Sequence, residues 1–265
     1  MKVVLFSGGL GLRLREYSDA TPKPMIPIGV RPILWHVMRY YAHFGHKDFV
    51  LCLGYRADVV KSYFLNYSEA ISNDFVMSDG GRSLRLVQTD IQDWRITFAD
   101  TGVHAIVGQR LRAVRPYLED EEMFLANYGD TLTDAPLPEL IEAFRRTDNV
   151  AAFLAVRPTY SFHLVDSAPD GTVRSITHVR EAETRINGGY FIFRREIFDY
   201  LREGEELVEG PFRRLIADGK LMAFRHDGFW APMDTLKDKQ DLDDLYESGS
   251  PPWALWLRAQ PGDSG

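Results

Sequence analysis

Short apolar runs of strand type alternate along the chain with segments of helical periodicity, and this alternation constrains the fold more than any other feature. The strand-type runs include KVVLF, DFVLCLGY, MFLANYG and VAAFLAV. Between the first two runs, apolar residues recur at the spacing of one helix face, at Ile33, Leu34, Val37, Met38 and Tyr41. The pattern predicts an α/β fold with a mostly parallel, Rossmann-like sheet flanked by helices. In such a sheet, ligands bind where loops leave the carboxyl ends of the strands.

The pattern changes after about residue 157, where shorter segments and turn signals such as SAPDG and NGG begin. These features predict a small antiparallel portion added to the same domain, because no Gly/Ser-rich linker divides the chain. We expect residues 1–248 to form a single domain and residues 249–265 to form a C-terminal tail or arm. The tail carries Trp253 and Trp256, which would either pack between subunits or fold back on their own subunit.

Composition excludes several classes of protein. A formal net charge of −7 and a pI near 5.5 argue against a general nucleic-acid binder, which needs a basic surface. No stretch approaches the roughly 20 apolar residues of a membrane span, and MKVVLF is too short for the apolar region of a signal peptide. The single cysteine, Cys52, lies within an apolar run and is expected to be buried. We therefore expect a cytoplasmic protein with no membrane or nucleic-acid partner.

A glycine-rich segment follows the first strand-type run. Gly8, Gly9 and Gly11 lack side chains that would keep backbone N–H groups away from a phosphate, but the same glycines would also suit an ordinary turn. Their spacing matches neither the dinucleotide fingerprint nor the P-loop. Arg13 and Lys23, the latter flanked by prolines, favour a phosphate site, because a triphosphate needs charge-assisted donors in a rigid setting.

Two acidic residues follow apolar runs further along the chain. Asp130 comes after MFLANYG, and Asp234 comes after GFWAPM. One acid in such a place is more often a turn former or helix cap than a ligand. Two acids together with nucleotide phosphates suit Mg²⁺, which keeps several waters and takes few protein ligands, so Mg²⁺ is the expected cofactor. No cysteine grouping accompanies the histidines expected on the surface or in packing, which are His36, His43, His46 and His104.

Taken together, several segments resemble the sugar-1-phosphate nucleotidyltransferases, and within them the branch that uses CTP and glucose 1-phosphate. The segments, found between Met1 and about Trp256, are GGLGLRL, PKPMIPIG, RPILWHVM, GYRADVVKSYF, ADTG, GQRLRAV, YGD, INGGYF and GFWAPMDTLKDK. The resemblance implies transfer of a nucleotidyl group from a nucleoside triphosphate to a sugar 1-phosphate. We also expect the protein to be a homo-oligomer.

The resemblance also implies a role for individual residues. Those implied to bind the nucleotide are Gly8, Gly9, Gly11, Arg13, Lys23 and Arg110. Those implied to bind the sugar phosphate are Asn187, Gly188 and His178. Those implied to be catalytic are Arg13, Lys23, Asp130 and Asp234, of which the two aspartates would hold Mg²⁺.

Two departures from the family pattern leave alternatives open. Leu12 stands where the family has threonine, and His178 stands where the family has the lysine of Glu-Lys-Pro. Either Arg180 or Arg185 replaces the lost charge, or the acceptor differs from glucose 1-phosphate. A nucleotide-sugar sensor without turnover is a further alternative, although it would not require Arg13, Lys23 and both aspartates. A glycosyltransferase would usually carry an Asp-x-Asp motif, which NYGDTLTD lacks.

Overall fold

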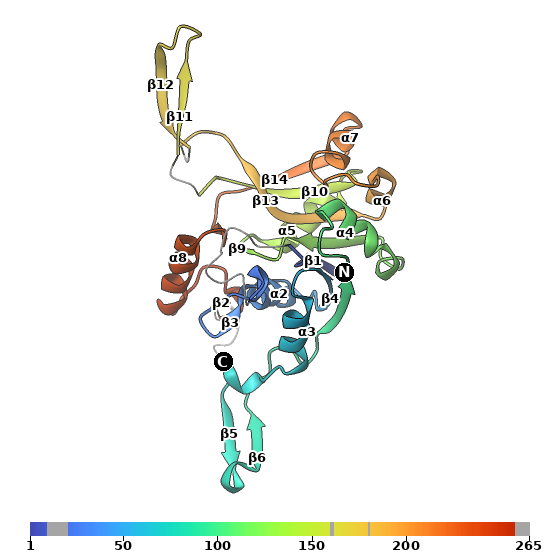
Figure 1. Cartoon of the computed structure of the whole chain (residues 1–265), viewed down its shortest axis with the longest axis vertical. Coiled ribbons are helices and arrows are strands. Elements are labelled where there is room, and N and C mark those ends of the chain that lie inside the picture. Colours follow the sequence, from blue (N-terminus) through green and yellow to red (C-terminus); the bar gives the residue numbers. More distant parts are fainter. Residues whose placement is uncertain (10–20, 160–161, 180, 258–265) are drawn as a thin grey trace.

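The computed structural model describes residues 1–9, 21–159, 162–179 and 181–257. Its centre is a seven-stranded sheet (Figure 1). In spatial order, the strands are β14 (Leu221–His226), β10 (Ala151–Val156), β13 (Ile186–Arg194), β8 (Met123–Asn127), β1 (Val3–Phe6), β4 (Asp48–Leu53) and β7 (Arg95–Asp100). Strand β13 runs antiparallel to β8 and β10, and the remaining pairings are parallel. The predicted α/β fold with a mostly parallel sheet is confirmed.

Side chains alternate between the two faces of the sheet along each strand. Because both faces are apolar, helices cover both of them. Val3 and Leu5 of β1 belong to one core cluster, and Val4 and Phe6 belong to the other. The first cluster packs against α2 (Ile33–His43), α3 (Ala57–Leu65), α5 (Leu137–Arg145) and α8 (Leu236–Glu247). The second packs against α4 (Val107–Ala113), α6 (Ile197–Tyr200) and α7 (Pro211–Ala217).

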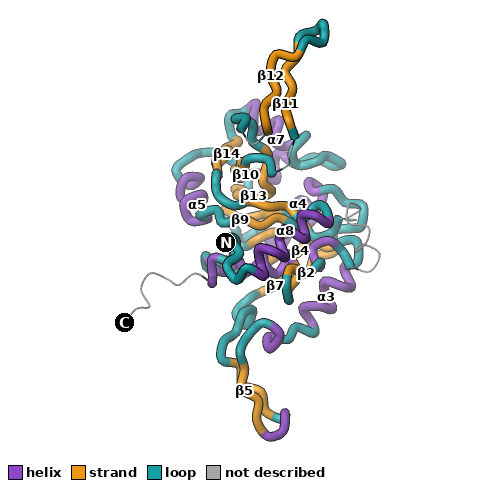
Figure 2. The backbone as a smooth tube through the Cα atoms, turned by 90° about the vertical axis from the view of Figure 1, so that its left-hand side faces the viewer, coloured by secondary structure: helices purple, strands orange, loops and turns teal. Residues whose placement is uncertain are grey.

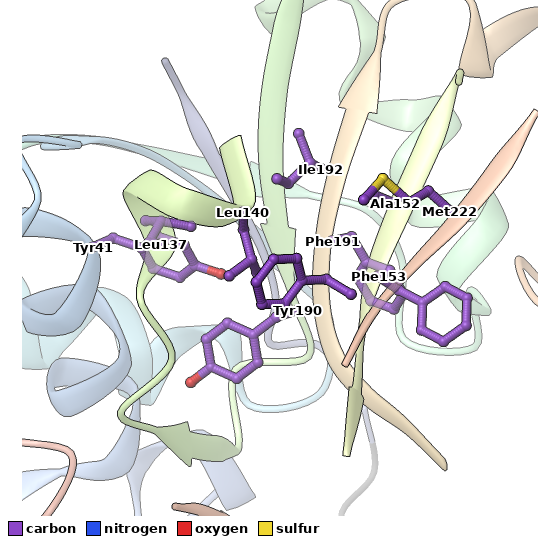
Figure 3. A pocket seen from close by; sticks show the side chains of 10 residues that line it. Tyr41, Leu137, Leu140, Ala152, Phe153, Tyr190, Phe191, Ile192 and Met222 are labelled. Atoms are coloured by element: carbon purple, nitrogen blue, oxygen red, sulfur yellow. The ribbon is translucent and has the colours of Figure 1, made fainter. Parts of the chain in front are cut away.

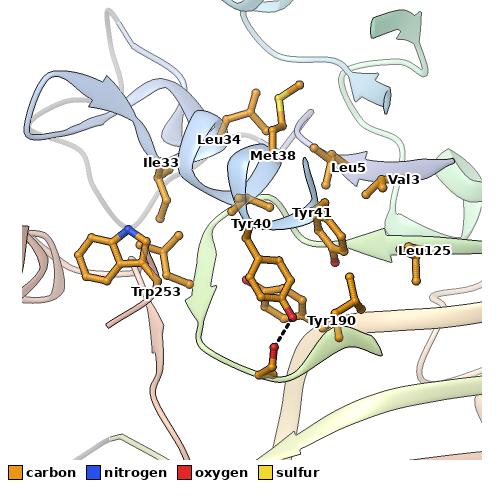
Figure 4. Packing of buried hydrophobic residues seen from close by; sticks show 14 of the residues in the cluster. Val3, Leu5, Ile33, Leu34, Met38, Tyr40, Tyr41, Leu125, Tyr190 and Trp253 are labelled. Carbon is orange, nitrogen blue, oxygen red and sulfur yellow. Dashed lines mark hydrogen bonds between the residues drawn. The ribbon is translucent and has the colours of Figure 1, made fainter. Parts of the chain in front are cut away.

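Helix α2 is the buried centre of the first cluster. Figure 4 shows its Ile33, Leu34 and Met38 together with Val3 and Leu5 of the sheet. The helical face predicted from the apolar spacing is therefore confirmed. Cys52, in β4, is buried and free, as expected.

Several short elements lie outside the main sheet and its helices. The 3₁₀ turns are η1 (Lys23–Met25), η2 (Glu69–Ile71), η3 (Asp79–Gly81), η4 (Arg115–Tyr117) and η5 (Leu255–Leu257). Two small ribbons lie beside the sheet and pair β2 (Pro27–Ile28) with β3 (Arg31–Pro32) and β9 (Thr131–Thr133) with β15 (Trp230–Pro232). No helix among the described residues is both long enough and apolar enough to cross a membrane.

Two further ribbons project from opposite ends of the molecule (Figures 1 and 2). We call them the first arm, β5 (Phe75–Ser78) with β6 (Ser83–Leu86), and the second arm, β11 (His163–Ser167) with β12 (Val173–His178). Both arms expose large apolar side chains, including Met77 at 65% and Ile176 at 63%. The sequence analysis did not predict the first arm.

The first arm is joined to the body by a buried polar network. Arg31, 2% exposed, donates from Nη2 to the Ser68 carbonyl oxygen at 2.8 Å and from Nε to Ser72 Oγ at 3.0 Å. Asp90 accepts from the hydroxyls of Ser72 and Tyr67, both at 2.7 Å. These contacts fix the two ends of the segment from which the arm projects.

The described part of the C-terminal tail folds back on its own chain. Trp253 is fully buried, and its Nε1 donates to His36 Nδ1 of α2 at 3.3 Å. Trp256 packs edge-on against Trp35, with ring centroids 5.9 Å apart. These contacts favour the second of the two interpretations of the tail. Residues 258–265 lie outside the described part.

An apolar crevice lies between α5 and the β10, β13 and β14 side of the sheet (Figure 3). Its lining residues are Tyr41, Leu137, Leu140, Ala152, Phe153, Tyr190, Phe191, Ile192, Met222 and Phe224. The hydroxyl of Tyr190 already donates to the Thr131 carbonyl oxygen at 2.7 Å. A crevice lined in this way offers no charged donor for a phosphorylated ligand.

Candidate active site

Two acidic side chains meet at the carboxyl edge of the parallel strands because of one short antiparallel pairing. Asp130 lies between β8 and β9, and Asp234 follows β15. Strands β9 and β15 pair with Thr131 opposite Pro232. The pairing extends one step further, since the Met233 N–H donates to the Asp130 carbonyl oxygen at 3.0 Å. This ladder places the two acids next to each other although they are far apart in sequence.

Lys23 joins both acids. Its Nζ lies 2.6 Å from Asp130 Oδ2 and 2.5 Å from Asp234 Oδ1. The lysine side chain is 13% exposed and the carboxylates are 23% and 21% exposed. Burial on its own would lower the pKa of Lys23, but the two carboxylates outweigh it, so the pKa is raised above its ordinary value. The three residues predicted to bind phosphate and metal therefore form one charged cluster, with the amine protonated.

A tight turn fixes Asp130. Asn127, the last residue of β8, accepts at Oδ1 from the Gly129 N–H at 2.6 Å. Gly129 has a φ of +79°, in the left-handed region that glycine enters at no steric cost. Asn127 is fully buried, so the hydrogen bond is shielded from water. The sequence analysis missed Asn127, although the Asn-x-Gly spacing is a known turn signal.

A helix cap fixes Asp234. Thr235 is the N-cap of α8, and its Oγ1 accepts from the Asp238 N–H at 3.1 Å. Asp238 Oδ2 accepts in return from the N–H groups of Asp234 at 3.0 Å and Thr235 at 2.8 Å. This reciprocal capping holds the backbone of Asp234 immediately before the first turn of the helix.

The segment that carries Lys23 is fixed by contacts with α2, α8 and the tail. His36 of α2 donates from Nε2 to the Ile28 carbonyl oxygen at 3.0 Å, in the neutral form whose Nδ1 accepts from Trp253. Burial lowers the pKa of His36 to about 4, so this form persists at neutral pH. Gly29, at φ +59°, packs so closely on Tyr246 of α8 that a Cβ would lie 2.1 Å from the ring. The turn that follows Lys23 is thus fixed by three elements.

Arg110 links the ends of several strands. It is 3% exposed, and its Nη2 donates to the Gly8 carbonyl oxygen at 2.8 Å, while Nη1 donates to Thr101 Oγ1 at 2.7 Å and to the Leu53 carbonyl oxygen at 3.2 Å. Burial lowers the pKa of this guanidinium. Arg110 therefore positions the start of the glycine segment at Gly8. That Arg110 contacts the nucleotide stays a prediction.

The glycine segment lies only partly within the described residues. A Cβ on Gly8 would lie 2.1 Å from Arg110 Nη1, so a side chain at this position would displace the arginine. Gly9 is exposed, with open space where a Cβ would stand. The predictions for Gly11, Leu12 and Arg13 fall outside the described residues.

The residues predicted to face the sugar phosphate lie along β13 and at the base of the second arm. Asn187 accepts at Oδ1 from the Gly189 N–H at 2.9 Å and donates from Nδ2 to the Tyr128 hydroxyl at 3.3 Å. The Gly188 carbonyl oxygen accepts from Trp230 Nε1 at 2.8 Å. His178 ends β12 opposite His163, with ring centroids 5.1 Å apart.

Of the two arginines expected to replace the lost lysine charge, Arg185 is engaged elsewhere. Its Nη2 donates to Asp227 Oδ1 at 2.8 Å, and its Nη1 donates to the His226 carbonyl oxygen at 3.1 Å. Arg180 lies outside the described residues.

Among the described residues, no cluster of three or more His, Cys, Asp or Glu side chains is arranged to hold a metal ion. The carboxylates of Asp130 and Asp234 nevertheless contact the same nitrogen atom, so a single cation can contact both. Two hard oxygen ligands with room for water and phosphate oxygens fit Mg²⁺.

A lysine and two carboxylates at the carboxyl edge of a mostly parallel sheet are suited to binding a phosphorylated ligand together with a metal ion. The chain belongs to the nucleotidyl transferase family, whose model matches residues 2–238. It is 38% identical to the glucose-1-phosphate cytidylyltransferase of Salmonella typhimurium over 97% of this chain and the whole of that enzyme. It is 34% identical to the probable glucose-1-phosphate cytidylyltransferase of Bacillus subtilis, again over 97% of this chain and all of that protein.

Solved structures share the fold. A glucose-1-phosphate thymidylyltransferase from Bacillus anthracis, described as putative, superposes with a TM-score of 0.66 at 17% identity, over 92% of this chain and 94% of that one. HddC from Yersinia pseudotuberculosis superposes with a TM-score of 0.63 at 20% identity, over 92% of this chain and 99% of that one. The predicted family membership is confirmed, and the chain is a nucleotidyltransferase.

Proposed function

We propose that the chain transfers CMP from CTP to glucose 1-phosphate, giving CDP-glucose and pyrophosphate. The observation that carries the proposal is the cluster of Lys23, Asp130 and Asp234 at the carboxyl edge. It occurs in a chain that is 38% identical, nearly from end to end, to a glucose-1-phosphate cytidylyltransferase.

The reaction needs charge neutralisation and alignment rather than a general base. A phosphate monoester has its second pKa near about 6, so the attacking oxygen of the sugar phosphate is already anionic at neutral pH. This oxygen forms a bond to the α-phosphorus, and the bond from that phosphorus to the bridging oxygen of the leaving pyrophosphate breaks. Positioned cations lower the barrier to such a transfer by stabilising charge on the non-bridging oxygens.

Each residue of the cluster has a part in this proposal. Lys23 binds the α-phosphate through its protonated amine, and Asp130 and Asp234 hold Mg²⁺. Bound Mg²⁺ would neutralise phosphate charge that the chain's own cations leave uncompensated. Asn127 and the cap of α8 keep the two carboxylates in place. A lysine whose amine stays charged suits an electrostatic role and not that of a proton acceptor.

The remaining assignments belong to the same proposal. Gly8, Gly9, Gly11 and Arg13 would receive the triphosphate, with Arg110 behind them. Asn187, Gly188 and His178 would face the acceptor. Residues 1–248 would act as one domain, and the free, buried Cys52 fits a cytoplasmic location.

We also propose that the protein is a homo-oligomer. A two-stranded ribbon alone is marginally stable in water. The ribbons of both arms also expose apolar side chains, and their contact with water is unfavourable. Packing of each arm against another copy of the chain would cover these side chains.

In a second candidate function, the chain transfers the same nucleotidyl group to a different phosphorylated acceptor. It is supported by His178, which supplies no permanent charge where the family has lysine, and by Arg185, which is engaged with Asp227. The acceptor would then be a phosphorylated compound other than glucose 1-phosphate.

A pyrophosphate-release screen tests these proposals. The four common nucleoside triphosphates are each paired with a panel of phosphorylated acceptors at saturating Mg²⁺. We expect CTP with glucose 1-phosphate to saturate below the millimolar range, within the usual span of enzyme KM values of about 1 μM to 1 mM. Saturation with another acceptor alone would favour the second candidate, and no turnover with any pair would contradict both.

A further inference from the structure

We infer that Lys23 closes the metal site of the free enzyme, because its ammonium occupies the position between Asp130 and Asp234 that a metal ion would take. A nucleotide phosphate then draws the lysine away and opens the carboxylates, so nucleotide and metal bind cooperatively. This inference rests on the proposed function and adds an order of events to it.

The first step is that the ammonium of Lys23 lies between the two carboxylates of the cluster. Lys23 Nζ contacts Asp130 Oδ2 at 2.6 Å and Asp234 Oδ1 at 2.5 Å, and both contacts are charge-assisted hydrogen bonds. Both bonds lie in a partly buried setting, where a charge pair is screened less than on the surface. A metal ion that takes the position between these two oxygens must displace the ammonium and so break both bonds.

The second step is that the same amine has an alternative partner. The nucleotide's α-phosphate is the group that Lys23 binds in the proposed reaction, and an ammonium held by phosphate cannot also fill the space between the carboxylates. Lysine suits this exchange, because its amine is a compact charge at the end of a flexible stem. The backbone around Lys23 need not move, which agrees with its fixation by His36, Tyr246 and the η1 turn.

The third step is thermodynamic. If nucleotide increases the affinity for metal by removing the lysine from the carboxylates, metal must increase the affinity for nucleotide by the same factor. The free enzyme would then bind divalent metal weakly although its two carboxylates are close together. Removal of the ammonium should therefore increase the affinity of the two carboxylates for divalent metal.

The test uses Mn²⁺ as the metal probe and the full-length protein without nucleotide. Mn²⁺ binding is followed by the electron paramagnetic resonance signal of the free aqua ion, so no turnover enters the measurement. Lys23→Gln should tighten Mn²⁺ binding by at least about tenfold, because two charge-assisted hydrogen bonds no longer compete. Lys23→Arg, which keeps a cation able to contact both carboxylates, should bind Mn²⁺ as weakly as the unmodified protein.

A matched control separates direct competition from a general loss of positive charge. Lys239 lies on α8, the helix that begins just after Asp234, and its ammonium pairs with Asp243. Lys239→Gln removes the same charge near the site without removing a contact to either carboxylate of the cluster. We expect it to change Mn²⁺ affinity by less than about threefold, as for a charge interacting only through solvent.

Thermal unfolding gives a second readout that does not depend on the strength of the resonance signal. A ligand that binds only the folded state stabilises it by RT ln(1 + L/Kd), where L is the free ligand concentration, so at one ligand concentration a tighter site gives a larger rise in Tm. At the same Mn²⁺ concentration, Lys23→Gln should therefore gain more in Tm than the unmodified protein or Lys239→Gln.

The possible outcomes separate this inference from the proposed function. Equal Mn²⁺ affinity in Lys23→Gln and the unmodified protein would overturn the inference, even if pyrophosphate release confirms the reaction. So would equal tightening in Lys23→Gln and Lys239→Gln. Binding that is unaffected by Asp130→Asn and Asp234→Asn would overturn both the inference and the assignment of the metal ligands.

Discussion

The charged cluster at the carboxyl edge and the two arms are built in opposite ways. Lys23, Asp130 and Asp234 come from distant segments, and each is held by hydrogen bonds or packing from other elements of the same chain. The arms are local ribbons whose apolar side chains face solvent. The chain's own contacts therefore account for the geometry of the cluster, whereas they leave the apolar side chains of the arms uncovered.

The largest effect is expected when a carboxylate of the cluster loses its charge. Asp234→Asn should lower turnover at saturating Mg²⁺ by at least about 10²-fold, the usual loss when one preorganised electrostatic group is removed. Steady-state pyrophosphate release measures it. Asp241→Asn, on an exposed face of the same helix, is the matched control and should retain full activity. Near-normal turnover in Asp234→Asn would contradict the role given to the cluster.

The second prediction concerns His36, which helps to fix the segment that carries Lys23. Burial lowers its folded-state pKa from 6.5 to about 4, so below pH 6.5 the unfolded chain takes up a proton that the folded chain does not. Stability should therefore fall as the pH drops from 6.5 to 4, by on the order of 3 kcal/mol from this group.

Urea unfolding between these pH values measures the slope. His36→Gln, whose amide can donate to Ile28 and accept from Trp253, should remove this part of it. His46, whose pKa is also lowered to about 4 by burial, would leave a residual slope. His104→Gln, at an exposed position, is the control for the substitution itself. An unchanged slope in His36→Gln would show that His36 is not held neutral in the folded protein.

A smaller effect is expected when the turn before Asp130 is loosened. Asn127→Ala leaves the Gly129 N–H without its acceptor, and the position of the Asp130 carboxylate becomes less well defined. Turnover should fall by about tenfold with little change in KM, since an ångström-scale displacement of a catalytic group costs up to about 10²-fold. Asn66→Ala, at the exposed end of α3, removes a comparable amide contact as the control. Equal kinetics for both variants would remove Asn127 from the list of positioning residues.

These cases show where sequence-based prediction succeeds and where it fails. The alternation of strands and helices and the buried face of α2 follow from local periodicity, so both could be predicted. Asp130 and Asp234 could be selected from their positions after apolar runs, but their convergence depends on the pairing of β9 with β15, which no local pattern reveals.

The sequence singles out Arg110 and Trp253, but it does not reveal their partners. Arg110 donates to Gly8 and Trp253 donates to His36, in each case across more than 100 positions, and periodicity cannot predict such contacts. In the first arm, β5 reads FVMS without alternation, and the alternation of SLRL in β6 spans only four residues, so neither strand gives a clear signal of a half-buried strand. Because the first arm packs on no core, its sequence carries too little periodicity to predict its strands.

The arms are expected to affect assembly while leaving the fold unchanged. Met77→Lys in the first arm should change the free energy of unfolding of the isolated chain by less than about 0.5 kcal/mol, because the side chain makes few contacts. In the assembled protein it should lower the mass measured by light scattering, since it places a charge in an apolar contact. Lys61→Met, at a partly exposed position of α3, is the control. An unchanged mass would indicate that the first arm is not an interface.

The smallest effect is expected where the second arm meets the proposed acceptor side. His178→Lys restores the permanent charge that the family has at this position, whereas histidine is largely neutral above its ordinary pKa of about 6.5. If glucose 1-phosphate is the acceptor, its KM should stay the same or fall by up to about threefold, because a partly exposed charge interacts weakly. His163→Lys, the same change on the facing strand, is the control and should leave the KM unchanged. A KM that rises tenfold in His178→Lys alone would mean that the site requires histidine itself, and would favour an acceptor other than glucose 1-phosphate.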